Sequence, residues 1–97
     1  MLGMFTVYIL TNRKHGTLYT GVTRELATRI DLHRGGAGSE FVSKHRLFRL
    51  VCIQPFNTAA EAIAQEKRLK RWRRSWKIQL IETDNPNWRD LYEDLLS

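Results

Sequence analysis

The chain has 97 residues, of which 42% are hydrophobic and 27% are charged, and its formal net charge is +6. This length supports one modest core, so residues 1–97 are expected to form a single domain, and the basic balance favours nucleic acid as partner. No run approaches the roughly 18 apolar residues of a membrane span, and Arg13 and Lys14 follow the first apolar run instead of preceding it. We therefore expect a cytoplasmic protein without membrane association.

Two segments near the start, 5–12 and 16–23, are rich in β-branched and aromatic residues and are predicted to pair as a β-hairpin. Alternation along the strands places Tyr8 of the first segment and Tyr19 of the second on the same, less apolar face. The two rings are expected to lie side by side, either as a cross-strand pair that only packs or as part of a site.

A helix is predicted from Arg24 to Arg34, capped by Thr23 and ended by the glycine-rich run that follows. Arg29 and His33 lie one turn apart along the flank of its narrow apolar stripe. These two side chains either form a solvated face or bind an anion that neutralises the Arg29 guanidinium.

Residues 35–46 are expected to form a polar, mobile loop that carries two further cationic side chains, Lys44 and His45. A third strand is predicted over 47–56 and is expected to end at Pro55. Cys52 lies in this apolar run, which favours an inert core thiol over a nucleophile.

The segment 58–80 is predicted to be one continuous helix, because Thr58 and Glu61 form a capping box and no Pro or Gly follows. Its apolar side is expected to hold Ala62, Leu69, Trp72, Trp76 and Leu80. Its basic side is expected to hold Lys67, Lys70, Arg71, Arg74 and Lys77.

Glu66 stands on the border between these two sides of the helix. Glu66 is either the salt-bridge partner of Lys70, four residues later, or a charged side chain that remains available to coordinate a bound partner. Beyond the helix, 84–87 reads as a turn, and a short acidic helix is predicted from Trp88 to Leu96.

One cysteine and three histidines give no zinc-binding spacing, and no glycine-rich phosphate loop is present. The remaining unusual polar residues are Tyr8, Tyr19, Arg29, His33 and Glu66. Their side chains suit phosphodiester hydrolysis, which needs an activated water, a cation beside the phosphate oxygens and a group that moves a proton. A single carboxylate can hold Mg²⁺, which keeps most of its waters.

The ordered set Thr6-Val7-Tyr8, Tyr19-Thr20-Gly21, Arg29, His33 and Glu66 resembles the GIY-YIG nuclease superfamily, above all its short stand-alone bacterial members. The resemblance covers nearly the whole chain. It implies an α+β fold, in which helices flank a small three-stranded antiparallel sheet in the order β-β-α-β-α-α.

The resemblance also implies a role for each matching side chain. Tyr8 would act as the base or position the water, and Tyr19 would help to position water or phosphate. Arg29 would neutralise the scissile phosphate, and His33 would orient groups or assist proton transfer. Glu66 would bind the one divalent ion, Mg²⁺ or Mn²⁺.

Asn85 resembles a late asparagine of some members and is carried as a further candidate. Thr6 replaces the glycine of the first motif and Thr20 the isoleucine of the second, so a side chain at position 6 is expected to narrow the site.

We therefore expect a metal-dependent endonuclease that selects the shape of its substrate and serves DNA repair or processing. DNA is the favoured substrate and RNA is the alternative, because nothing in the sequence distinguishes the sugar. The side chains expected to bind the phosphate backbone of the nucleic acid are Lys44, His45, Lys67, Lys70, Arg71, Arg74 and Lys77. The alternative is a catalytically inactive nucleic-acid-binding module that uses the basic face of 58–80. A protein-interaction domain would require exposed tryptophans, whereas the spacing of Trp72, Trp76 and Trp88 favours core positions.

Overall fold

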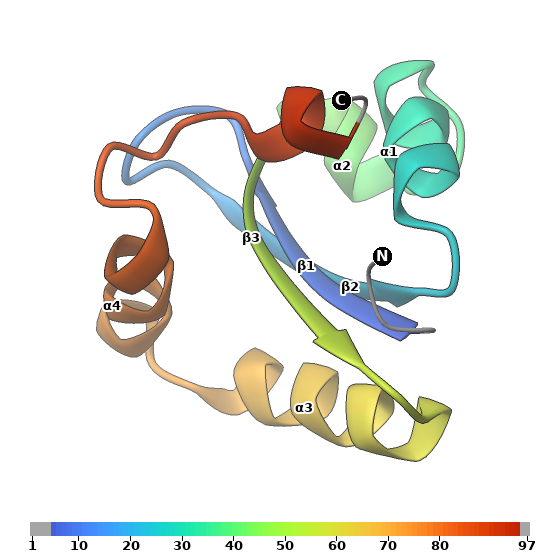
Figure 1. Cartoon of the computed structure of the whole chain (residues 1–97). Helices are drawn as coiled ribbons and strands as arrows, with labels where there is room; N and C mark the ends of the chain where they lie inside the picture. Colours follow the sequence, from blue (N-terminus) through green and yellow to red (C-terminus); the bar gives the residue numbers. More distant parts are fainter. Residues whose placement is uncertain (1–4, 96–97) are drawn as a thin grey trace.

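A computed structural model describes residues 5–95 and has an α+β fold, with helices on both faces of a three-stranded sheet (Figure 1). The elements in chain order are β1 (Phe5–Thr11), β2 (Leu18–Thr23), α1 (Leu26–Arg34), α2 (Glu40–His45), β3 (Arg49–Phe56), α3 (Ala59–Arg71), α4 (Arg74–Asp84) and the 3₁₀ helix η1 (Leu91–Leu95). The expected fold class and antiparallel sheet are confirmed. In the part of the chain that is described, no helix is long and apolar enough to cross a membrane.

The sheet has the order β2-β1-β3, and β1 pairs antiparallel with both neighbours. Tyr8, in the middle of β1, lies opposite Gly21 of β2 and Ile53 of β3. Pro55 does not end β3 as expected, because the strand continues to Phe56. β3 is an edge strand, where a residue without an N–H group is tolerated.

Each face of the sheet is covered by its own hydrophobic cluster, as the alternation of side chains in β1 requires. The cluster beneath α3 and α4 contains Val7, Ile9, Val51, Cys52, Ala62, Leu69, Ile81 and Trp88. The cluster beneath α1 and α2 contains Tyr8, Leu10, Leu26, Ile30, Val42, Leu47 and Leu50. Cys52 is a core residue, as predicted, and burial raises the pKa of its thiol to about 12.

The predicted continuous helix over 58–80 is wrong. Its start is as expected, since Thr58 caps α3 and accepts a hydrogen bond from the Glu61 N–H. However, Trp72 and Arg73 adopt extended backbone angles and separate α3 from α4. Figure 1 shows that the two helices run in different directions. The break lets α4 fold back so that Ile81 enters the core, which a straight helix would carry past the sheet.

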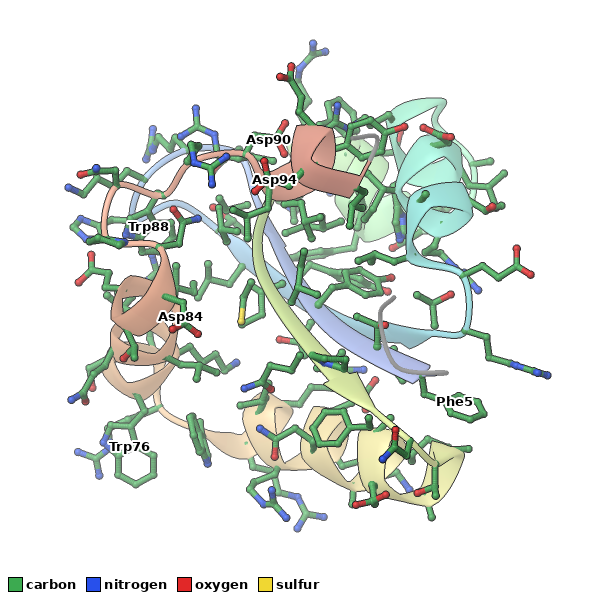
Figure 2. The ribbon with its side chains drawn as sticks, viewed as in Figure 1. Phe5, Trp76, Asp84, Trp88, Asp90 and Asp94 are labelled. Carbon is green, nitrogen blue, oxygen red and sulfur yellow. The ribbon has the colours of Figure 1, made fainter. Side chains whose placement is uncertain are left out.

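Because of this break, Trp76 is not the core residue that its spacing predicted. Its side chain is 48% exposed and projects from α4 away from the sheet (Figure 2). Trp88 is fully buried, and Trp72 packs against the core with part of its surface exposed.

Residues 35–46 are not a mobile loop throughout, because they contain α2. The Ser39 hydroxyl caps this helix by accepting from the Val42 N–H, and Arg46 ends it in the left-handed region at φ 55°. The buried Val42 side chain fixes α2 against the sheet. α1 begins at Leu26 rather than Arg24, and Thr23 accepts instead from the Glu25 N–H.

The acidic helix predicted from Trp88 to Leu96 is a 3₁₀ helix over 91–95, and Leu96 lies outside the described residues. Asp90, at its entrance, accepts hydrogen bonds from the Leu50 N–H and from Arg34 of α1 (Figure 2). This one carboxylate therefore joins the C-terminal segment to both β3 and α1.

Candidate active site

Three rings from three separate elements meet on the sheet face that α1 covers. Tyr8 of β1 lies 6.4 Å from Tyr19 of β2 and 6.0 Å from His33 of α1, measured between ring centroids. The rings of Tyr19 and His33 complete the triangle at 5.7 Å, edge to face. The two tyrosines therefore lie side by side as predicted, and α1 adds the histidine.

His33 reaches this cluster because it lies one turn beyond Ile30, on the buried side of α1. Its Nε2 atom forms a buried 3.0 Å hydrogen bond with the Tyr8 hydroxyl, and both side chains are 2% exposed. Across the described residues, His33 Nδ1 is the buried side-chain polar atom without a hydrogen-bond partner. The Tyr8 hydroxyl and one imidazole nitrogen thus form a directly coupled pair.

Gly21 makes room for the Tyr8 side chain. A Cβ atom at position 21 would lie 2.5 Å from both Cζ and the hydroxyl oxygen of Tyr8, far inside van der Waals contact. The glycine of the second motif is therefore needed for close approach rather than for an unusual backbone angle. Sequence reasoning quoted Gly21 as part of a motif but gave it no role.

Burial and neighbouring charges set the protonation of this pair. Burial, with a smaller effect of Tyr19, raises the pKa of Tyr8 well above its usual value. Burial and the Arg29 guanidinium lower the pKa of His33. At neutral pH the pair therefore consists of a protonated phenol hydrogen-bonded to a neutral imidazole.

Arg29 and Glu66 border the same cluster from two helices. Both act on the pKa of Tyr8, Arg29 lowering it and Glu66 raising it. Arg29 also lines a surface groove of about 450 Å³ between α1 and α3, which it shares with Ile63, one turn before Glu66. Tyr8, Tyr19 and His33 are thus in ring contact, and the charges of Arg29 and Glu66 both act on Tyr8, although only Arg29 of these five lines the groove.

Glu66 forms the ion pair that the sequence suggested. Its Oε2 atom lies 2.8 Å from Lys70 Nζ, and the carboxylate is the buried member, with 14% of the Glu66 side chain exposed against 54% for Lys70. An ion pair with so exposed a partner contributes at most about 1 kcal/mol. Lys70 can therefore be displaced at low cost by another cation.

A divalent ion would have one protein carboxylate here. Within residues 5–95, no three His, Cys, Asp or Glu side chains gather closely enough to form a metal site by themselves. One partly exposed carboxylate with hard oxygen donors still suits Mg²⁺ or Mn²⁺, which take their other ligands from water and substrate phosphates. Glu66 fits that role.

The model of the GIY-YIG catalytic domain matches residues 4–79, most of this chain. The chain belongs to the GIY-YIG family. It is 36% identical over 76 residues to a UPF0213 protein of Oceanobacillus iheyensis, covering 78% of this chain and 87% of that one. A UPF0213 protein of Staphylococcus saprophyticus is 35% identical over 68 residues, covering 70% and 83%. The solution NMR structure of a UPF0213 protein from Bacillus halodurans shares the fold at a TM-score of 0.56 and 32% identity, over 89% of this chain and 90% of that one.

The matched GIY-YIG region contains Tyr8 to Glu66 and ends before Asn85. Asn85 is buried, and its side-chain amide donates to the carbonyl oxygens of Val51 and Arg89 while its oxygen accepts from the Arg89 N–H. These bonds tie the turn after α4 to β3. In this GIY-YIG domain the geometry of Asn85 is that of a structural residue.

The expected basic face is divided between helices. Lys67, Lys70 and Arg71 remain exposed on α3. Arg74, beyond the break, donates to the carbonyl oxygens of His15 and Gly16 in the loop between β1 and β2.

The three remaining members of the expected basic set lie on α4 and α2. Lys77 is half-buried, and its burial, with the nearby Arg74, lowers its pKa. Lys44 and His45 lie across the sheet on α2, where both are exposed.

Phe41 is a neighbour of the site that sequence reasoning missed. Its ring stacks on Tyr19 at 6.4 Å with an interplanar angle of 28°. An aromatic residue three positions before Lys44, in a segment otherwise small and polar, was the available signal.

Proposed function

We propose that this protein is a metal-dependent endonuclease that hydrolyses phosphodiester bonds of nucleic acid. The observation that carries the proposal is the buried hydrogen bond between Tyr8 and His33, with Arg29 and Glu66 at its border, in a chain of the GIY-YIG family.

The coupled pair supplies a path for the proton of the attacking water. The Tyr8 oxygen accepts that proton while the phenol proton passes to Nε2 of the neutral His33. The high pKa of Tyr8 disfavours a free phenolate, so the transfer to His33 is what lets this tyrosine act as a base. Tyr19, in ring contact with both, holds their orientation and positions the water or phosphate.

Fixed positive charge is needed where the phosphate oxygens gain negative charge. Arg29 supplies it from the wall of the groove, where its guanidinium can donate to two oxygens at once. Glu66 would hold the single Mg²⁺ or Mn²⁺, which supplies Lewis-acid stabilisation of the reacting phosphate when bound.

The proposed substrate class rests on the positive charge of the protein. A net charge of +6 and the exposed cations Lys67, Lys70 and Arg71 favour contacts to phosphates, which give affinity without sequence information. We therefore propose DNA of particular shape, such as flaps, nicks or branches, as the substrate, and a role in DNA repair or processing. RNA is the second choice.

The alternative function is a nucleic-acid-binding module without turnover. The ion pair between Glu66 and Lys70 favours it, because a carboxylate satisfied within α3 needs no metal.

Cleavage assays with Glu66→Gln separate the two functions. The substrates are labelled single-stranded, duplex, nicked, flapped and branched DNA together with RNA, each with Mg²⁺, Mn²⁺ or EDTA. Glu61→Gln is the matched control, because it removes a carboxylate from the same helix. The backbone N–H of residue 61 still donates to the Thr58 hydroxyl, and the glutamine side-chain oxygen can still accept from that hydroxyl.

The nuclease proposal expects metal-dependent cutting that Glu66→Gln abolishes and Glu61→Gln preserves, with binding retained in both variants. Tyr8→Phe should lower the cleavage rate by about 10²- to 10⁴-fold. Wild-type protein that binds every substrate and cuts none, or a Glu66→Gln variant that cuts normally, would instead support the binding module.

A further inference from the structure

Phe41 presents an exposed aromatic ring beside a candidate catalytic side chain. The residue is 45% exposed, and its ring centroid lies 6.4 Å from that of Tyr19 and 4.5 Å from that of His45. The geometry of α2 forces this exposure, since the next residue, Val42, is the one that enters the core.

The surroundings of Phe41 combine positive charge with an open hollow. Lys44 and His45 follow at three and four positions, so they share a helix face with the ring. A hollow of about 720 Å³ adjoins it and is also lined by Gly36, Gly38, Ser39, Glu40, Ser43 and Lys44. One carboxylate and one ammonium leave the hollow without formal net charge, which favours an uncharged aromatic group over a phosphate.

We propose that Phe41 is a stacking platform for an unpaired nucleobase of the nucleotide next to the phosphodiester at Tyr8 and Tyr19. Lys44 and His45 then contact the neighbouring phosphates. This inference rests on the proposed function for the position of the phosphodiester, and it narrows the substrate to nucleic acid with an unpaired nucleotide at the cleavage point. A base inside an intact duplex cannot offer its face to the ring.

The test uses fluorescence of 2-aminopurine, which falls when the base stacks on an aromatic ring. An oligonucleotide with this base is bound as a single strand and as a duplex, in EDTA so that no cleavage is required. The variants are Phe41→Leu, which keeps apolar bulk but removes the ring, and Phe41→Trp, which keeps a ring. Trp76→Leu is the control, an aromatic of similar exposure on α4.

Phe41→Leu is expected to abolish the quenching and weaken single-strand binding by about 5- to 150-fold, with duplex affinity unchanged. Phe41→Trp should retain both signals, and Trp76→Leu should behave as wild type. Equal weakening of single-strand and duplex binding, or quenching that survives in Phe41→Leu, overturns the platform.

Cleavage measured in parallel distinguishes failure of this inference from failure of the nuclease proposal. Quenching by Phe41 in a protein that cuts no substrate supports the platform and contradicts the nuclease. Metal-dependent cutting that Phe41→Leu leaves unchanged on substrates with unpaired nucleotides contradicts the platform alone.

Discussion

Tyr8 and His33 bury two polar ring groups in a protein with a small core. Leaving a buried hydroxyl unpaired costs about 1–3 kcal/mol, and the bond between the two side chains removes that cost for Tyr8. The same bond fixes the position of the proposed base, so stability and chemistry depend on one contact.

Gly21→Ala is expected to disturb this contact without removing any functional group. The new Cβ would overlap Tyr8, so we expect a loss of about 1–3 kcal/mol in the free energy of unfolding and a marked fall in cleavage. Gly35→Ala is the control, because its Cβ would meet the Asp31 carbonyl oxygen at an ordinary 3.4 Å and its φ is −80°. Urea unfolding measures both, and equal stability of the two variants would contradict the assigned role of Gly21.

Acid should weaken the fold through His33. Its pKa is near 6.5 when unfolded and is lowered in the folded protein by burial and by Arg29. Between these two values the unfolded state binds more protons than the folded state. The contribution of His33 to the free energy of unfolding is therefore complete above pH 6.5 and is lost as the pH drops through this interval.

Urea unfolding from pH 8 to pH 5 checks this dependence. His33→Gln should flatten the acid loss, whereas His45→Gln, at an exposed position, should follow the wild type. A His33→Gln curve parallel to that of the wild type would rule out His33 as the cause.

At the scale of elements, the division of 59–84 into α3 and α4 decides which side chains reach the core. Neither Pro nor Gly marks the break. Tertiary contacts hold it instead: Arg74 donates to the loop between β1 and β2, and Glu82 accepts from the Trp88 indole and pairs with His15. α4 is therefore positioned by residues distant in the chain.

Ile81→Ala and Trp76→Ala test this arrangement, because the two helix geometries predict opposite rankings of the stability losses. Ile81 is 1% exposed in the core, so its truncation should cost about 2–5 kcal/mol of unfolding free energy. Truncation of Trp76, which is nearly half exposed, should lower the unfolding free energy by clearly less, although it removes far more atoms. Thermal and urea unfolding give the ranking, and the reverse order would favour one continuous helix.

On the scale of the whole molecule, the net charge of +6 is spread over both sides of the sheet instead of one helix face. Exposed cations lie on α3 beneath one face and on α2 above the other. Some of the cationic side chains stabilise the fold instead, as Arg34 does through its 2.6 Å ion pair with Asp90.

Lys67→Gln and Arg74→Gln should separate these two uses of positive charge. Lys67 is exposed, so its loss should reduce the slope of log affinity against log salt concentration by about 1 and leave unfolding unchanged. Arg74→Gln should lower the urea midpoint, because the His15 and Gly16 carbonyl oxygens lose their donor. Salt titrations of DNA binding and urea unfolding measure the pair, and identical behaviour of the two variants would contradict the distinction.

The sequence by itself determined the features that depend on near neighbours in the chain. Strand alternation put Tyr8 and Tyr19 on one face, and the Thr58 cap marked the start of α3, because backbone geometry and capping act over a few residues. Helical spacing likewise placed Arg29 and His33 on one flank of the first helix.

Only the tertiary structure decided the features that depend on distant contacts. The break at Trp72, the exposure of Trp76 and the use of Arg74 within the fold follow from the way α4 docks on the sheet. The bond between Tyr8 and His33 likewise needs α1 to pack across β1. Periodicity reveals which side of a helix is apolar, but burial and hydrogen bonding depend on the partner that covers that side.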